Sequence, residues 1–296
     1  MSIPDSQLDT WTNQGSVTNS ASTHTTLRNK LKAYNWSGRF RYDDYLQGSY
    51  ANTTNIRGES DVDIVIECTS FFYNNLTAEE KQKLGFTGTS YSLSDFRSEV
   101  VKALIACYGE KYIDPSGANS IKVLPSDTSN RLYADVIVCA TYKRYHNLKV
   151  IAQGITFWNQ KSNAQITNYP KLHKDNGWTK NKNTNGNYKP IVRLFKNARR
   201  CMIEGDQELK KKFSSYAVEC LLYNVPDQYY FGKTWQEIFL NILGYLINVF
   251  DQDAVGKFVT QSGQHYLIGD NPVQWSKNNA QEFVTRLAKL WQEYYN

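Results

Sequence analysis

The stretch Gln47-Gly-Ser-Tyr-Ala-Asn-Thr-Thr-Asn-Ile-Arg-Gly-Glu-Ser-Asp-Val-Asp-Ile-Val-Ile-Glu67 decides the fold of this chain. The pair Gly48 and Ser49 precedes two aspartates, Asp61 and Asp63, that open an apolar run typical of a β-strand. Residues two apart in a strand point to the same face, so both carboxylates face one spot while the alternate apolar side chains enter a core. Hard oxygen ligands on one face suit Mg²⁺, which takes its other ligands from phosphate and water. The Gly-Ser turn offers N–H groups to the same phosphates. The pattern predicts a nucleotidyl-transfer site.

A third carboxylate stands in a second apolar strand, predicted over residues 132–141. Asp135 is the one charged side chain in this strand, and burying it costs several kcal/mol unless it is paired or metal-bound. The alternative is a buried salt bridge to an Arg or Lys. Together with Asp61 and Asp63, Asp135 could hold two Mg²⁺ ions, with Mn²⁺ as a substitute, and could accept the proton of the attacking hydroxyl.

The bulk composition is that of an ordinary globular protein. The chain has 296 residues, 41% of them hydrophobic and 21% charged, with a net charge of +6 that is too small to establish nucleic-acid binding. Five scattered cysteines and four histidines form no zinc pattern, so we expect free thiols in a reducing compartment. No signal peptide or membrane-spanning stretch is apparent, and we expect a cytoplasmic protein.

The order of predicted elements gives an α+β fold. The helix before residue 38 is followed by strands over 40–46, 61–68, 121–124, 132–141 and 154–158, with a helix after a capping box at Ser92. Residues 159–189 lack periodicity and are predicted as a long loop. Helices are then expected over 191–202, 210–223, 234–250 and 279–294. We therefore predict a mixed catalytic lobe over residues 1–188 and a helical lobe over 189–296.

The helical lobe carries further candidates. Arg193, Lys196 and Arg200 share one helix face; such a stripe is usually solvated, but Lys196 among apolar neighbours could meet a triphosphate. Ser215 could bind phosphate oxygens or cap a helix, and Tyr216 could stack on a base or pack in the core.

Two motif matches are rejected. Asp251-Gln-Asp253 repeats the D-x-D spacing, but it follows a helix and has no Gly-Ser pair ahead of it, so we interpret it as surface charge. Phe231-Gly-Lys-Thr234 lacks the earlier glycine of a P-loop.

These motifs, in this order and spacing, resemble the bacterial cGAS/DncV-like nucleotidyltransferases (CD-NTases) of the DNA polymerase β-like superfamily. The resemblance covers about residues 40–225 and rests on Gln47-Gly-Ser-Tyr50, Ser60-Asp-Val-Asp-Ile-Val-Ile66, Asp135, Ile191–Arg199 and Ser215-Tyr-x-x-Glu219. It implies two lobes with an N-terminal spine helix, an active site in the cleft, and Mg²⁺-dependent synthesis of a cyclic oligonucleotide that activates an effector in anti-phage signalling (CBASS).

The resemblance also assigns roles to residues. Asp61, Asp63 and Asp135 match metal ligands, and the Gln47-Gly48-Ser49 segment matches the phosphate-binding turn. Lys196 and Ser215 match triphosphate contacts, and Tyr216 matches the base-stacking aromatic. The Asn159–Lys189 loop, with Thr167–His173 and Asn176-Gly177 in it, resembles the lid region of the clade that mostly makes cyclic dinucleotides, which makes Asn168 a candidate for reading a base edge.

The interpretation is a synthase of a 3′,5′-linked cyclic dinucleotide. ATP and GTP are the expected substrates, with UTP as a further candidate; the effector is reached through the product, and neither DNA nor a membrane is required. One alternative is a nucleotidyltransferase that modifies a protein, tRNA or small molecule. Another is a catalytically silent nucleotide or RNA sensor, against which the three aspartates argue.

Overall fold

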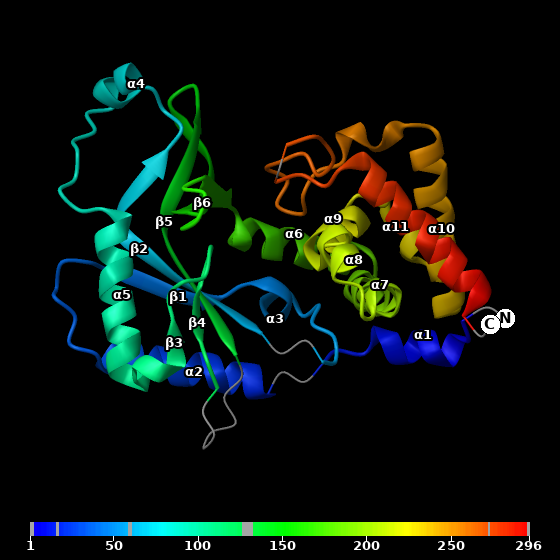
Figure 1. Ribbon diagram of the computed structural model, residues 1–296. Helices are drawn as coiled ribbons and strands as arrows, with labels where there is room; N and C mark the ends of the chain where they lie inside the picture. The colour runs from blue at the N-terminus through cyan, green and yellow to red at the C-terminus, as the bar shows by residue number, and fades with distance from the viewer. Residues whose placement is uncertain (1–2, 16–17, 59–60, 126–132, 272, 295–296) are drawn as a thin grey trace. The chain divides into compact units, whose positions relative to one another are not determined.

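A computed structural model describes residues 3–15, 18–58, 61–125, 133–271 and 273–294 (Figure 1). The chain divides into two compact units. The first, here called the helical unit, comprises residues 1–15, 52–58 and 171–296. The second, the sheet unit, comprises residues 16–51 and 59–170. Each unit has its own hydrophobic core.

The sheet unit is built on a mixed sheet. Its strands are β1 (Tyr42–Leu46), β2 (Val62–Asn74), β3 (Ile113–Asp114), β4 (Ile121–Val123), β5 (Ala134–His146), β6 (Lys149–Trp158) and β7 (Gln165–Asn168). Hydrogen-bonded neighbours run β1-β2-β5-β4-β3, and β6 pairs with β5 and β7. Only β2 and β5 are parallel among the described pairs. Helices of this unit are α2 (Thr18–Ala33), α3 (Gly48–Asn52), α4 (Ala78–Lys83), α5 (Leu93–Tyr108) and the 3-10 turn η1 (Glu110–Tyr112).

The core of the sheet unit is made by β2 side chains, buried on both faces from Ile64 to Cys68, and by helices α2 and α5. Val62, Ile64 and Ile66 of β2 are fully buried, and they cluster with residues from α2 and α5. The predicted capping box starts α5, because Ser92 accepts a hydrogen bond from the Asp95 N–H while the Asp95 carboxylate accepts one from the Ser92 N–H. Residues of α2 and α5 pack against β2, because its long apolar run must be buried.

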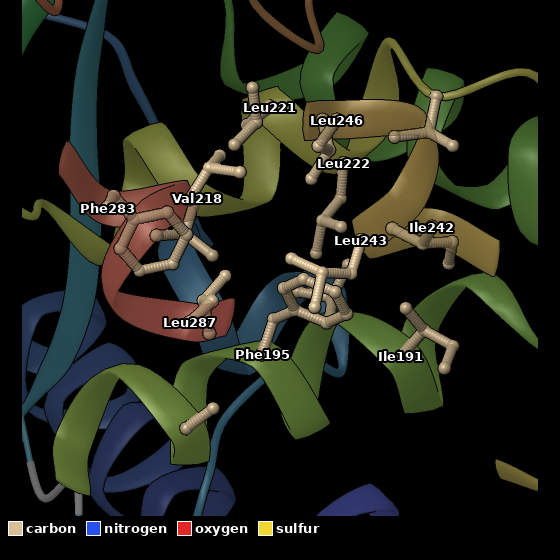
Figure 2. Packing of buried hydrophobic residues seen from close by; sticks show 14 of the residues in the cluster. Ile191, Phe195, Val218, Leu221, Leu222, Ile242, Leu243, Leu246, Phe283 and Leu287 are labelled. Atoms are coloured by element: carbon tan, nitrogen blue, oxygen red, sulfur yellow. The ribbon is translucent and has the colours of Figure 1, made fainter. Parts of the chain in front are cut away.

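The helical unit packs amphipathic helices around a second core. Its elements are α1 (Asp5–Thr12), α6 (Pro170–Asn183), α7 (Tyr188–Ile203), α8 (Gln207–Lys212), α9 (Ser215–Tyr223), η2 (Asp227–Tyr230), α10 (Trp235–Asp251), η3 (Ala254–Lys257) and α11 (Lys277–Glu293). Figure 2 shows Phe195 of α7, Leu222 of α9 and Leu243 of α10 within this core, with further side chains from α11.

The predicted division at residues 188 and 189 differs from the compact units. The boundary lies between Pro170 and Lys171, because α6 buries His173, Gly177 and Lys180 in the helical unit. Residues 1–15 also belong to that unit, since α1 packs on α7.

Three predicted elements are corrected. The long loop over 159–189 contains β7 and α6; the helix begins at Pro170, which suits a first turn, and has almost no apolar stripe by which it could be predicted. The expected helix over 210–223 is two helices, interrupted at Phe213 and Ser214. The expected N-terminal helix is α1 and α2.

Two further expectations concern the membrane and the thiols. Across the described ranges, every helix falls short of the length and apolar character that a bilayer crossing demands. All five cysteines are free thiols, as expected, although Cys201 is exposed and Cys107 is half-buried.

Candidate active site

The parallel pairing of β2 and β5 aligns two of the predicted carboxylates. Asp63 and Asp135 are direct partners in the register, so their side chains leave the same face of the sheet side by side. Both are half-buried, each the second residue of its strand. Asp61 is exposed and lies two residues before Asp63, just ahead of β2. The sequence prediction from alternation concerned Asp61 and Asp63; that Asp63 and Asp135 share a face follows from the register of β2 and β5.

The predicted Gly-Ser turn lies against this pair. Gly48 starts α3 with a φ of 69°, and a Cβ built on it would lie 2.1 Å from the Oδ2 atom of Asp63. The Gln47 N–H donates to the Asp63 carbonyl at 3.0 Å, which fixes the turn to β2. Gln47, Gly48 and Ser49 are half-buried. Only glycine permits this approach, because any side chain would occupy the position of the carboxylate.

Asp135 is held by a hydroxyl group. The Ser120 Oγ donates to Asp135 Oδ1 at 2.8 Å. Among the residues that the structure describes, no ion pair involves Asp135, so the alternative of a buried salt bridge finds no support there. Sequence reasoning missed Ser120, which lies just before β4, the neighbour of β5.

The donor set fits a hard divalent cation. Within the described ranges, no three His, Cys, Asp or Glu side chains are grouped so as to hold a metal ion. Mg²⁺, however, is commonly bound by one or two carboxylates and completes its shell with phosphates and water. Asp63 and Asp135 supply two such carboxylates, and Asp61 lies two residues before Asp63. Metal binding at this place remains a proposal.

Asn168 is at the end of β7 and its side chain is exposed. The strand approaches β6 closely at Gly154, where a Cβ would lie 2.4 Å from the Asn168 carbonyl oxygen and 2.7 Å from the Tyr169 ring. Because Gly154 has no side chain, β7 can pack this closely on β6. The Asn168 side chain is exposed, which a residue that contacts a nucleotide base requires.

In the helical unit, Lys196 is buried in an ion pair. Its Nζ lies 2.8 Å from Oε2 of Glu219, and Lys196 and Glu219 are 2% and 3% exposed. The Glu219 carboxylate also accepts from Thr54 Oγ1 at 2.9 Å and from Asn52 Nδ2 at 3.3 Å, and it lies 3.1 Å from His173 Nε2. Burial alone would raise the pKa of the Glu219 carboxyl, but the charge of Lys196 and the hydrogen bond of His173 hold it well below its usual range. The predicted triphosphate contact of Lys196 stays a prediction.

Arg193 is half-buried and Arg200 is exposed, and both donate to backbone carbonyls. Arg193 donates to the carbonyls of Thr12 and Thr53, each at 2.6 Å, and Arg200 donates to the carbonyl of Arg57. Burial lowers the pKa of Arg193 to about 10. Both side chains therefore hold separate segments of the helical unit together.

Ser215 and Tyr216 are the first two residues of α9, and their predicted contacts with phosphate and base stay predictions. Ser214 is the N-cap, since its Oγ accepts from the Ala217 N–H, so Ser215 is not needed as a cap. Tyr216 is 51% exposed, so it is not a core residue. Its ring stacks on that of His173, with centroids 5.4 Å apart and an interplanar angle of 23°.

Sequence reasoning missed the partners of these residues. Glu219 is part of the Ser215-Tyr-x-x-Glu219 motif and His173 lies inside the predicted 159–189 loop, but the sequence assigns neither residue a role. Lys189 was also missed. It is 5% exposed, its ammonium has no hydrogen-bond partner among the described residues, and it lies 3.5 Å from the centroid of the Trp178 ring.

Comparison with known proteins agrees with this geometry. Residues 175–292 match the family described as cGAS/DncV-like nucleotidyltransferase C-terminal helical domain. The chain is 42% identical to a protein of Rhodothermus marinus named cyclic UMP-AMP synthase, over 98% of both chains. It is 33% identical to the cyclic nucleotide synthase CdnE01 of Staphylococcus haemolyticus, over 99% of this chain and 100% of that protein.

Solved structures show the same fold. The Rhodothermus marinus CdnE c-UMP-AMP synthase, solved with Apcpp and Upnpp, superimposes with a TM-score of 0.90 at 41% identity, covering 99% of this chain and 98% of that one. The Elizabethkingia meningoseptica CdnE cyclic dinucleotide synthase, solved with GTP and Apcpp, gives a TM-score of 0.80 at 25% identity, covering 99% and 100%.

The α+β fold and the paired carboxylates define a nucleotidyltransferase. This chain belongs to the cGAS/DncV-like nucleotidyltransferase family, as its relatives at 42% and 33% identity show across nearly the whole length.

Proposed function

We propose that the chain is a cyclic dinucleotide synthase that joins two NTPs into a 3′,5′-linked second messenger for anti-phage signalling. The observation that carries the proposal is the register of Asp63 with Asp135 beside Gly48. The proposal is supported by the 42% identity of this chain to a cyclic UMP-AMP synthase.

The reaction is an in-line attack of a 3′-hydroxyl on the α-phosphorus of an NTP. A new P–O bond forms, the bond to pyrophosphate breaks, and the hydroxyl proton passes to a carboxylate, for which Asp135 is the candidate. Ser120 orients Asp135 for this role through its 2.8 Å hydrogen bond. When bound, Mg²⁺ would offset the charge of the phosphates at Asp61, Asp63 and Asp135. A second attack of the same kind closes the ring.

ATP and UTP are the substrates that the relatives favour. The Rhodothermus marinus relative, at 42% identity, is named for a UMP-AMP product, and its structure contains analogues of both nucleotides. GTP, expected from the sequence beside ATP, is bound in the structure of the more distant Elizabethkingia enzyme. Asn168, exposed at the end of β7, is the candidate for choosing the base, because an amide can pair with a base edge.

The test is a product assay. Purified protein is incubated with Mg²⁺ and all four NTPs, treated with phosphatase, and the products are identified by mass spectrometry. We expect a phosphatase-resistant cyclic dinucleotide containing U and A, abolished by Asp63→Asn and by chelation of the metal.

The matched control is Asp251→Asn, in the second D-x-D of the chain, which is exposed and should leave the product unchanged. A protein that consumes no NTP, or that transfers a nucleotide only to a protein or RNA acceptor, would contradict the proposal.

A further inference from the structure

His173 lies behind the exposed aromatic ring at the start of α9. It is 7% exposed, while the Tyr216 ring that stacks on it is 51% exposed. The offset, nearly parallel geometry is one that aromatic pairs prefer. One face of the Tyr216 ring is thus covered by imidazole, and the side chain still offers surface to a ligand.

His173 makes hydrogen bonds through both its ring and its backbone carbonyl. His173 Nε2 lies 3.1 Å from Glu219 Oε1. An ionised carboxylate only accepts, so Nε2 carries the proton and donates. The carbonyl of His173 accepts from Gln261 Nε2 at 2.7 Å. At Gly177, one turn further along α6, a Cβ would lie 2.4 Å from the same Gln261 nitrogen, so glycine is needed for this contact.

The hydrogen bond of His173 to Glu219 and its stacking on Tyr216 have different consequences. Its hydrogen bond completes the buried network of Glu219, which any satisfied core histidine could do. Its ring restricts Tyr216, an exposed side chain that would otherwise lose rotamer freedom when it stacks on a ligand. Holding such a side chain in advance avoids an ordering cost that corresponds to about a 2- to 10-fold change in affinity.

We propose that His173 is a positioning residue of the synthase, and that His173 and Tyr216 form a two-layer platform for the flat face of a nucleotide base. The inference rests on the proposed function, because it assumes that Tyr216 receives the base. The proposal adds that the Tyr216 ring is held in place by His173 of α6. His173 is in turn held by Glu219, which lies on the same helix as Tyr216.

Two substitutions separate the ring from the hydrogen bond. His173→Gln keeps a donor for Glu219 and removes the ring, whereas His173→Phe keeps a ring and removes the donor. We expect H173Q to retain the wild-type Tm and to raise the KM for nucleotide about 3- to 10-fold with little change in kcat. H173F should show a lower Tm and a KM near that of the wild type.

A purely structural histidine predicts a different KM for H173Q. H173Q would then match the wild type in both Tm and KM, and the inference would be overturned. If H173Q does not fold, H173F decides alone, since a raised KM in a folded H173F would also overturn it.

A double-mutant cycle with Tyr216→Ala tests whether His173 acts through Tyr216. In the Y216A background, H173Q should change the KM less than about 2-fold, because the ring it supports is gone. An undiminished effect of H173Q would contradict the platform.

Failure of the proposed function looks different. In that case the wild-type protein itself would make no cyclic product and would not bind a non-hydrolysable ATP analogue in calorimetry.

Discussion

Gly48 has a φ of 69°, and a Cβ there would lie 2.1 Å from Asp63 Oδ2. Replacing it with alanine strains the backbone and displaces the carboxylate from its place beside Asp135. We expect Gly48→Ala to lose about 1–2 kcal/mol of unfolding free energy and, since a shift of about 1 Å in a reacting group costs about 100-fold, to lose at least that much activity. Product formation and urea unfolding measure the two effects.

Gly38 is the matched control for Gly48. It has a φ of 75°, but a Cβ there meets nothing within 4 Å. Gly38→Ala should therefore lose a similar stability and keep its activity. If both variants lost activity equally, general destabilisation and not the position of Asp63 would be the cause.

Lys189 is a buried lysine whose ammonium makes a cation–π contact with the Trp178 ring. Burial lowers its pKa to about 8, with the nearby charges of Arg193 and Lys174 also lowering it and Glu219 raising it. In the unfolded chain the pKa is about 10.4, so the unfolded state binds more protons between about pH 8 and 10.4. The contribution of Lys189 to stability is therefore least favourable below pH 8 and improves as the pH rises through this window.

We expect Lys189→Met to raise the unfolding free energy at pH 7 by roughly 1–3 kcal/mol. The advantage over the wild type should shrink towards pH 10. Chemical denaturation at a series of pH values measures the difference. Lys174→Met, an exposed neighbour on α6, serves as control and should have little effect. A less stable K189M would show that the contact with Trp178 outweighs the cost of burial.

At the scale of elements, the Lys196–Glu219 pair joins α7 to α9 and to residues 52–54. Glu219→Gln leaves the Lys196 ammonium buried without its counter-charge, which typically costs about 3–5 kcal/mol. The double variant Lys196→Met/Glu219→Gln removes the charge as well and should recover part of that loss. A double variant no more stable than E219Q would contradict this account.

The pH dependence of the pair has a defined sign. The pKa of the Glu219 carboxyl is lower in the folded state, so its stabilisation is present above about pH 4.5 and is lost as the pH falls below that value. The stability difference between wild type and E219Q should therefore be largest near neutral pH and narrow on acidification.

Sequence patterns predicted elements where one physical rule dominates. The apolar runs predicted β2 and β5, and the capping box predicted the start of α5. The register of Asp63 with Asp135 was not predicted, because it depends on how the two strands pair. The pattern failed for α6, whose buried positions are His173, Gly177 and Lys180 and not aliphatic residues.

The polar network could not be predicted from spacing. Glu219 meets Thr54, 165 positions away, and His173, 46 positions away. No periodicity links such positions, so the network depends on how the helices pack. Lys196, a candidate triphosphate contact on the sequence, is a buried partner of Glu219, and spacing alone could not show this pairing.

At the scale of the molecule, the helical unit is assembled from three separate stretches of chain. Ile3, Leu8 and Trp11 belong to its core, although they are nearly two hundred residues before most of their partners. Trp11 is 5% exposed and meets the ring of Tyr294 edge-on at 5.7 Å. The N-terminal helix is therefore part of the helical unit's core and not an appendage.

Trp11→Ala should open the helical unit selectively. Removing a buried tryptophan costs about 3–5 kcal/mol, and the loss falls on a core that is distinct from that of the sheet unit. Hydrogen exchange read by mass spectrometry should show faster exchange in α7, α9 and α11 and near wild-type protection in β2 and β5. Trp36→Ala is the matched control, because Trp36 packs against the other core and should produce the reverse pattern. If either variant raised exchange equally in both units, the two cores would unfold as one cooperative structure, and the stability of each unit would depend on the other.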